Sequence, residues 1–230
     1  MKSAGLGLLL SVTAALAGCP GPTDVPVDAH TDDRGSSVTD AGTADVADVT
    51  DAGDGYAWRL PPGSPQPVVP ADNPMSAVKV ELGRHLFYDE RLSLNETQSC
   101  ATCHQQALAF SDGRAQGLGS TGELHPRGPM SLTNVAYLTT LAWANPALVR
   151  LEAQALVPLF GEFPVELGFS GQEQELLARL EADATYVELF EAAFPEQPEP
   201  VSLDGVAKSL ASFQRVLLSY DSPYDRYAYG

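Results

Sequence analysis

Apolar side chains recur at helical spacing through most of the chain after residue 56. The run 75–88 places Val78, Leu82 and Leu86 on one face, and Pro74 suits the first turn of a helix because its ring already holds a helical φ. No stretch of useful length alternates apolar and polar residues as a half-buried strand would. The pattern therefore predicts an all-α domain.

Three more helices are expected in the C-terminal half. Ser170 and Glu173 have the spacing of a capping box ahead of the first of them. The second is expected over 185–194, where Pro195 ends it, and the longest begins after Ser202. Their apolar stripes are Leu176, Leu177 and Leu180; Val187, Phe190 and Phe194; and Val206, Leu210, Phe213 and Leu217.

The first 18 residues have the composition of a targeting signal. Lys2 supplies a positive charge, residues 4–17 are apolar and uncharged, and residues 16–19 (LAGC) form a bacterial lipoprotein processing box. The apolar run is shorter than the about 20 residues that span a membrane. We expect acylation of Cys19 and a lipid-anchored protein on the periplasmic side. Pro20, in place of a retention aspartate, favours the outer membrane; an ordinary secretory signal is the alternative.

Residues 19–55 form a linker rich in aspartate. Between residues 20 and 55 there are nine Asp and one Arg among small and polar residues, a composition that predicts a disordered tether. Repulsion between the carboxylates would extend it. A calcium-binding repeat is the alternative, but no EF-hand loop pattern with a closing Glu is present.

Residues 56–230 are also acidic, with 21 acidic and 11 basic side chains in a chain of net charge -17. This balance argues against a nucleic-acid partner. It would attract cationic proteins through long-range steering that salt weakens. Solubility alone is the other explanation.

The stretch 100–104 reads Cys-Ala-Thr-Cys-His, the attachment pattern of a c-type haem. Three residues of separation place Cys100 and Cys103 on one side of a helical turn, where each sulfur can bond a haem vinyl group. His104 would then ligate the iron. A redox or zinc pair followed by a chance histidine is the alternative. The third cysteine, Cys19, is accounted for by the anchor, which leaves none for a disulfide.

Several linked motifs surround this stretch. They are 82–93 (LGRHLFYDERLS), 98–104 (QSCATCH), 109–114 (AFSDGR), 130–137 (MSLTNVAY), the region of Trp143, and 154–168. In this order they resemble the N-terminal haem domain of the di-haem cytochrome c peroxidase/MauG family, and the resemblance covers 56–230. It implies a cytochrome c-like haem domain with additional helices.

Within the family, the likeness is greatest to the MbnH-like branch. Members of that branch resemble MauG and are implicated in oxidising a tryptophan of a partner protein. The wider family reduces hydrogen peroxide with electrons from a small redox protein. The resemblance thus implies a haem oxidoreductase that reacts with hydrogen peroxide, with one of these two kinds of protein partner.

The resemblance also implies roles for individual residues. It makes His104 the proximal iron ligand and places Gln154, Pro158 and Glu166 on the distal side of the haem. A carboxylate there can carry a proton from one peroxide oxygen to the other, which is the role expected of Glu166. The Gln154 amide would orient the bound oxygen, and Pro158 would narrow the pocket. Without the resemblance, Glu166 would be taken for a solvated loop acid.

Trp143 matches a tryptophan that the family places between its two haems, where an indole can relay electrons. Core packing is the alternative. His125 and Met130 follow the haem motif at a distance that could let either reach the distal face, since some members use a distal histidine in a resting state. Ordinary loop positions are the simpler expectation for both. His85 is expected to pack or cap rather than bind metal.

The chain also departs from the family pattern. It contains one Cys-x-x-Cys-His motif where family members have two, so the second haem domain is expected to be absent and one haem c is predicted. A truncated gene, an incomplete sequence or a split enzyme would each explain this. Gly128 stands where members often have a calcium-binding asparagine, so calcium is not predicted. The segment between Gln154 and Glu166 is two residues longer than the usual peroxidase spacing. The MbnH-like branch has this longer form.

Two functions from different classes follow. One is a peroxidase-type haem enzyme, which needs an open or displaceable distal position on the iron. The other is a single-haem periplasmic electron carrier, or an inactive remnant, in which Met or His fills that position and limits the haem to electron transfer.

Overall fold

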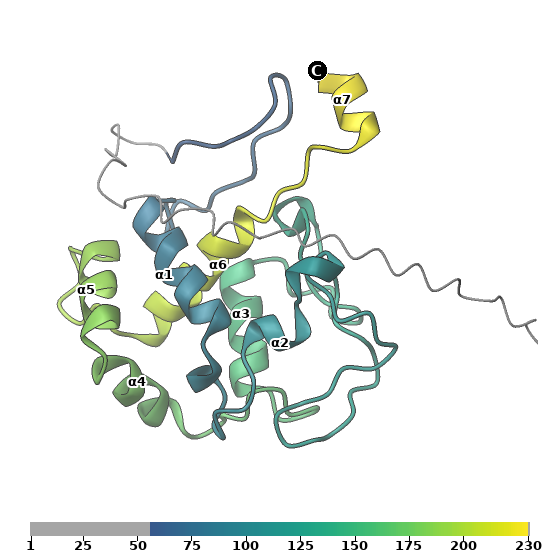
Figure 1. Ribbon diagram of the computed structural model, residues 1–230. Helices are drawn as coiled ribbons and strands as arrows, with labels where there is room; N and C mark the ends of the chain where they lie inside the picture. The colour runs from purple at the N-terminus through teal and green to yellow at the C-terminus, as the bar shows by residue number, and fades with distance from the viewer. Residues whose placement is uncertain (1–55, 230) are drawn as a thin grey trace, which may run out of the picture. The chain divides into compact units, whose positions relative to one another are not determined.

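The computed structural model describes residues 56–229 (Figure 1). The predicted signal peptide 1–18, Cys19 and the linker 19–55 lie outside the described residues. The helices are α1 Ala77–Tyr88, α2 Cys100–Cys103, α3 Leu151–Phe160, α4 Glu173–Glu181, α5 Ala184–Ala193, α6 Leu203–Arg215 and α7 Pro223–Tyr229. Three short 3₁₀ turns, Glu90–Leu92, Gln106–Leu108 and Val135–Tyr137, join them. Residues 56–229 contain isolated bridges but no strand, which confirms the all-α prediction.

None of these helices is both long enough and apolar enough to cross a bilayer. The four helices expected from apolar spacing are all present, as α1, α4, α5 and α6. Of these, α1 begins slightly later than its apolar run, at Ala77, because the side chain of Ser76 caps it by accepting a hydrogen bond from the Lys79 N–H at 3.2 Å.

Helices α1 and α6 form the centre of the core, and α3 and α5 flank them (Figure 1). The side chains that fill the contact are fully or almost fully buried; they are Leu82, Leu86 and Phe87 from α1 and Val206, Leu210 and Phe213 from α6. Phe87 contacts Phe213 with ring centroids 5.1 Å apart and also lies 6.4 Å from the His104 ring. The core therefore continues directly into the haem-motif region.

Gly83 allows α1 to approach α6 closely. A Cβ at this position would overlap the backbone carbonyl of Ser209 and lie 2.8 Å from the Cβ of Phe213. We expect Gly83→Ala to lower the free energy of unfolding by about 2–3 kcal/mol, because backbone atoms of α6 must move to admit the methyl group. Urea denaturation measures this change. An unchanged midpoint would mean that the two helices separate without cost.

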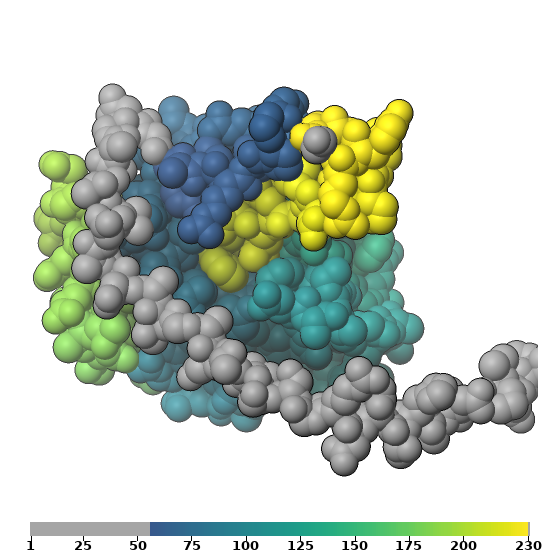
Figure 2. All heavy atoms as spheres, turned by 45° about the horizontal axis from the view of Figure 1, so that its top comes forward, coloured from purple at the N-terminus to yellow at the C-terminus, as the bar shows by residue number. Residues whose placement is uncertain are grey.

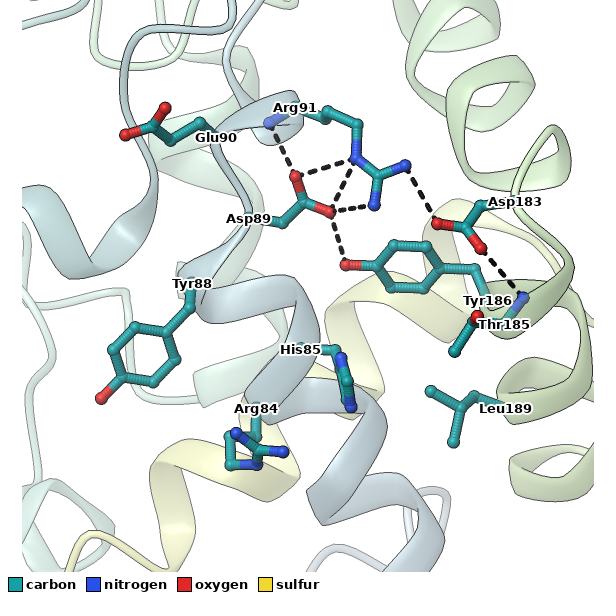
Figure 3. A pocket seen from close by; sticks show the side chains of 10 residues that line it. All are labelled: Arg84, His85, Tyr88, Asp89, Glu90, Arg91, Asp183, Thr185, Tyr186 and Leu189. Atoms are coloured by element: carbon teal, nitrogen blue, oxygen red, sulfur yellow. Dashed lines mark hydrogen bonds and ion pairs between the residues drawn. The ribbon is translucent and has the colours of Figure 1, made fainter. Parts of the chain in front are cut away.

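Helix α5 attaches to the C-terminal end of α1 through a polar network (Figure 3). The guanidinium of Arg91 pairs with Asp89 at 2.7 Å and with Asp183, the N-cap of α5, at 3.1 Å. The hydroxyl of Tyr186 donates to Asp89 at 2.8 Å. Burial alone would raise the pKa of Asp89, but the hydrogen bonds from Arg91 and Tyr186 outweigh it and lower that pKa. His85, labelled in Figure 3, is exposed on α1, and its Nε2 lies 3.1 Å from the Glu81 carboxylate.

The predicted capping box at Ser170 and Glu173 is wrong. Helix α4 begins at Glu173 with Gln172 as its N-cap. The Ser170 hydroxyl instead donates to Glu162 at 2.8 Å, and Glu173 accepts from the Gly171 N–H at 3.2 Å. Gly171 has a φ of +70°, so the chain turns between the two residues and cannot form the box.

The last described residues lie against the first ones. Figure 2 shows α7 (yellow) beside the segment that follows residue 56 (dark blue). The hydroxyl of Tyr137 donates to the Pro65 carbonyl at 2.7 Å, and its ring lies 6.3 Å from that of Tyr220. Tyr220 in turn contacts Tyr229 of α7 with centroids 5.9 Å apart. An aromatic row thus joins the two ends of the described chain.

Candidate haem-binding site

The Cys-x-x-Cys-His segment forms a single capped helical turn. In α2 the Thr102 hydroxyl accepts from the Ser99 N–H at 3.0 Å, and the His104 N–H donates to the Cys100 carbonyl at 2.9 Å. Both cysteines are free thiols that line the same cavity. Burial raises the pKa of Cys100 to about 12 and also raises that of Cys103, so both remain protonated. The turn therefore presents two neutral sulfurs to one cavity.

A backbone contact fixes the ring of His104. Its Nδ1 lies 2.8 Å from the Phe110 carbonyl oxygen, which can only accept, so Nδ1 carries the proton. Burial lowers the pKa of His104 and favours the neutral imidazole. The lone pair on Nε2 is then available to a metal, with the ring held by a partner of the kind that metal-ligating histidines use.

The cavity beside these residues has a volume of about 440 Å³. This lies within the range of small-molecule and cofactor sites. Its walls are largely apolar and come from α1, α2, α3, α6 and the loops between them. Every predicted haem-side and distal residue lines it: Cys100, Cys103, His104, Trp143, Gln154, Pro158 and Glu166. Residues up to 66 positions apart in sequence therefore share one cavity.

Helix α3 supplies two of these residues. Gln154 and Pro158 lie one turn apart and share the face that lines the cavity. Pro158 lies inside the helix and has no N–H, so it cannot donate to the Gln154 carbonyl. The carbonyl of Pro158 accepts from the Leu167 N–H at 2.9 Å. This bond ties the loop that carries Glu166 to the helix that carries Gln154.

Glu166 is partly buried at the cavity wall. Burial raises the pKa of its carboxyl above the ordinary value, while the charge of His125 acts in the opposite direction. Its backbone carbonyl accepts from the Ser120 N–H at 2.8 Å. The simple alternative of a solvated loop acid does not describe this position. A carboxyl with a raised pKa can both accept and donate a proton closer to neutral pH.

Trp143 lies at the rim of the cavity, with 62% of its side chain exposed. Its indole N–H donates to the Gly128 carbonyl at 2.8 Å. Core packing, the alternative use of this tryptophan, is therefore wrong. Gly128 itself passes so close to the Arg114 carbonyl that a Cβ would overlap that oxygen.

The two loop residues considered as distal ligands, His125 and Met130, also line the cavity. His125 Nε2 lies 3.2 Å from the Val165 carbonyl oxygen, on the loop of Glu166. The structure thus brings both residues into the site.

The residues of the cavity fit a covalently attached haem. Two free thiols and an oriented neutral imidazole provide the attachment groups and the axial ligand, and the apolar walls suit the macrocycle. Gln214 from α6 also lines the cavity, and its buried Oε1 has no hydrogen-bond partner within residues 56–229.

Residues 77–230 match a family model described as di-haem cytochrome c peroxidase. The chain belongs to this di-haem peroxidase family. Two curated relatives support this family assignment. The chain is 38% identical over 173 residues to the methylamine utilization protein MauG of Methylorubrum extorquens, covering 75% of this chain and 46% of that protein. It is 32% identical over 157 residues to cytochrome c551 peroxidase of Pseudomonas aeruginosa, covering 68% and 44%.

A solved structure is also similar. It is described as a MauG-like protein associated with microbial copper homeostasis, and it shares 50% sequence identity at a TM-score of 0.72 over 75% of this chain and 50% of that one. The chain thus spans about half the length of the di-haem peroxidase relatives that it matches.

Two features of this candidate site could not be foreseen from the sequence. The Phe110 carbonyl fixes the His104 ring, but a backbone acceptor leaves no trace in residue type. Gln214 lies on α6 between two residues of the apolar stripe. A buried glutamine within such a helix is the one signal that could have marked it.

Proposed function

We propose that Cys100 and Cys103 hold one haem c covalently, that His104 ligates its iron, and that the haem reacts with hydrogen peroxide as in a cytochrome c peroxidase. The convergence of the attachment residues with Gln154 and Glu166 on one cavity supports this proposal most directly. When bound, the haem would supply an iron centre that exchanges electrons with peroxide and promotes cleavage of its O–O bond.

The chain's own residues would handle the proton. The Glu166 carboxylate accepts it from one peroxide oxygen and returns it to the other, which leaves as water. The Gln154 amide donates a hydrogen bond that orients the peroxide beside Glu166. Pro158 narrows the space around them and limits the entry of water.

For the electron source we propose oxidation of a tryptophan in a partner protein, as in the MbnH-like branch. Support comes from the 50% identity to the MauG-like protein associated with copper homeostasis. The exposed indole of Trp143 at the cavity rim would relay electrons from a docked protein. A small redox protein, the donor expected for a cytochrome c peroxidase, is the other candidate for the same position.

For location we propose the periplasmic side of the membrane, with the lipid anchor at Cys19. The processing box at residues 16–19 and the haem motif support it, because c-type haem is attached outside the cytoplasm.

The proposed function is tested on the haem-loaded protein. A haem stain of a denaturing gel should show covalent haem. Absorption and EPR spectra recorded before and after hydrogen peroxide should then show an iron with an open or displaceable distal position that changes on mixing. A permanently low-spin iron that ignores peroxide would instead support the electron carrier and overturn the enzyme assignment.

A further inference from the structure

A hairpin formed by residues 117–127 contacts both the haem motif and the loop of Glu166. Its arms are joined by the Leu118–Leu124 bridge. At one arm the Leu118 carbonyl lies 3.9 Å from Cys103 Sγ. Close to its tip the Ser120 N–H donates to the Glu166 carbonyl at 2.8 Å. The hairpin thus spans from the attachment residues to the proposed proton carrier.

His125 adds a side-chain contact from the second arm. Its Nε2 lies 3.2 Å from the carbonyl oxygen of Val165, the residue before Glu166. Because this oxygen can only accept, Nε2 carries the proton in this contact. Together with the Ser120 bond, it gives the Glu166 segment two adjacent backbone anchors on the hairpin.

Gly119 makes this approach possible. A Cβ at this position would overlap the Val165 carbonyl oxygen and lie 3.1 Å from His125 Nε2. Gly117, two residues earlier on the same arm, has more space: a Cβ there would come no nearer than 3.6 Å to any atom, the nearest being His125 Nδ1. The hairpin therefore has a steric requirement for glycine at 119 that position 117 does not share.

The charges around Glu166 come from few groups. His125 is the cation that acts on its carboxylate, and the carboxylate in turn acts on Cys100 and Cys103 of α2. Haem attachment converts both thiols into thioethers, which do not titrate. Arg127, at the base of the hairpin, also lines the cavity but is exposed. Glu123 on the hairpin and Glu162 on the loop of Glu166 are exposed acids. On the side of α3, the cavity residues Gln154 and Pro158 are uncharged.

We propose that His125 is a positioning residue for Glu166. Its N–H holds the backbone at Val165, so the carboxyl group stays at the cavity wall. Its charge opposes the burial that raises the pKa of Glu166. This inference rests on the proposed function, in which ionised Glu166 accepts the peroxide proton.

The decisive variant is His125→Gln in the haem-loaded protein, because glutamine keeps an N–H donor but never carries charge. We expect its rate with hydrogen peroxide to fall several-fold on the acid limb of the pH profile, where Glu166 is partly protonated, because loss of the His125 charge moves the Glu166 pKa upward. On the plateau above this limb the rate should match the wild type within about twofold. A purely structural role would change the rate by the same factor on both parts of the profile. That result would overturn the electrostatic part of the proposal.

A second readout does not need peroxide. Infrared difference spectra follow the C=O stretch of the protonated carboxyl groups as pH is raised. The band that is missing in Glu166→Gln is assigned to Glu166. The pH at which half of the Glu166 band is lost should be higher in His125→Gln than in the wild type. If the wild type ignores peroxide while this midpoint still moves, the proposed function fails and the coupling stands. An unmoved midpoint contradicts the coupling itself.

Gly119→Ala tests the anchoring. Its methyl group must push the Val165 carbonyl away, so we expect the Glu166 band to broaden or shift and the peroxide rate to fall at every pH. The matched variant Gly117→Ala adds the same methyl group to the same arm and should leave the Glu166 band unchanged. Equal spectra for the two variants would show that the hairpin does not position the carboxyl group.

Discussion

The variant Glu166→Gln is expected to react with hydrogen peroxide about 100- to 10,000-fold more slowly than the wild type, with covalent haem attachment intact. Glutamine has nearly the same shape but cannot accept a proton from peroxide at any accessible pH. The backbone bond from Ser120 to residue 166 does not depend on the side chain and should survive. Stopped-flow absorption of the haem-loaded variant measures the rate, and a haem stain measures attachment.

The pH dependence of the wild-type rate with hydrogen peroxide tests the same role of Glu166. Burial raises the pKa of Glu166 above the ordinary value of 4.5, and the ionised carboxylate is the active form. The rate should therefore fall as pH drops through this raised pKa and reach a plateau above it. In Glu166→Gln this acid limb should disappear from the profile.

Glu162→Gln is the matched control for this change. Glu162 lies on the same loop, is exposed, and accepts a hydrogen bond from the Ser170 hydroxyl at 2.8 Å. Its substitution removes an equal charge four residues away and should leave the rate close to that of the wild type. A wild-type rate in Glu166→Gln would refute the assignment of Glu166 as the proton carrier.

Sequence patterns predicted the parts of this fold that depend on side-chain spacing. The stripes of α1 and α6 were visible because one face is apolar and the other polar. Helix α3 was not foreseen as a helix, although its residues were expected at the site. All but Glu152 and Gln154 are apolar, Pro158 inside it resembles a helix stop, and Arg150 provides no capping bond. Its placement depends on tertiary packing.

The same distinction holds for the site. Cys100, Cys103 and His104 could be picked out as haem-attachment candidates because covalent attachment demands a fixed spacing in the chain. The partners of His125 and His104 could not, because both are backbone carbonyls, at Val165 and Phe110. A carbonyl belongs to every residue type, so only the folded chain reveals which one is used.

The second large effect is expected from the buried ion pair between α3 and α6. Glu152 of α3 accepts from Arg215 of α6 at 2.6 Å and from the Asn73 side chain at 2.8 Å. The side chains of the pair are only 11% and 4% exposed. Because Gln154 lies two residues along the same helix, this pair also holds one wall of the haem cavity in place.

We expect Glu152→Ala to lower the free energy of unfolding by about 3–5 kcal/mol, because it leaves the Arg215 guanidinium buried without an acid. Urea denaturation measures the loss. The matched control is the double variant Glu152→Leu with Arg215→Met, which removes both charges and fills the space with apolar groups. Its stability should lie close to that of the wild type, since exchange of a whole buried pair is often neutral.

Acid titration separates the ion pair from simple packing. Burial alone would raise the pKa of Glu152, but the bonds from Asn73 and Arg215 outweigh it and lower that pKa below the ordinary 4.5. A lowered pKa in the folded state means that the stabilisation is complete above about pH 4.5 and is lost as pH falls through the folded value. The wild type should therefore lose stability on acidification more steeply than the double variant. Parallel curves would show that Glu152 contributes through its packing and not through its charge.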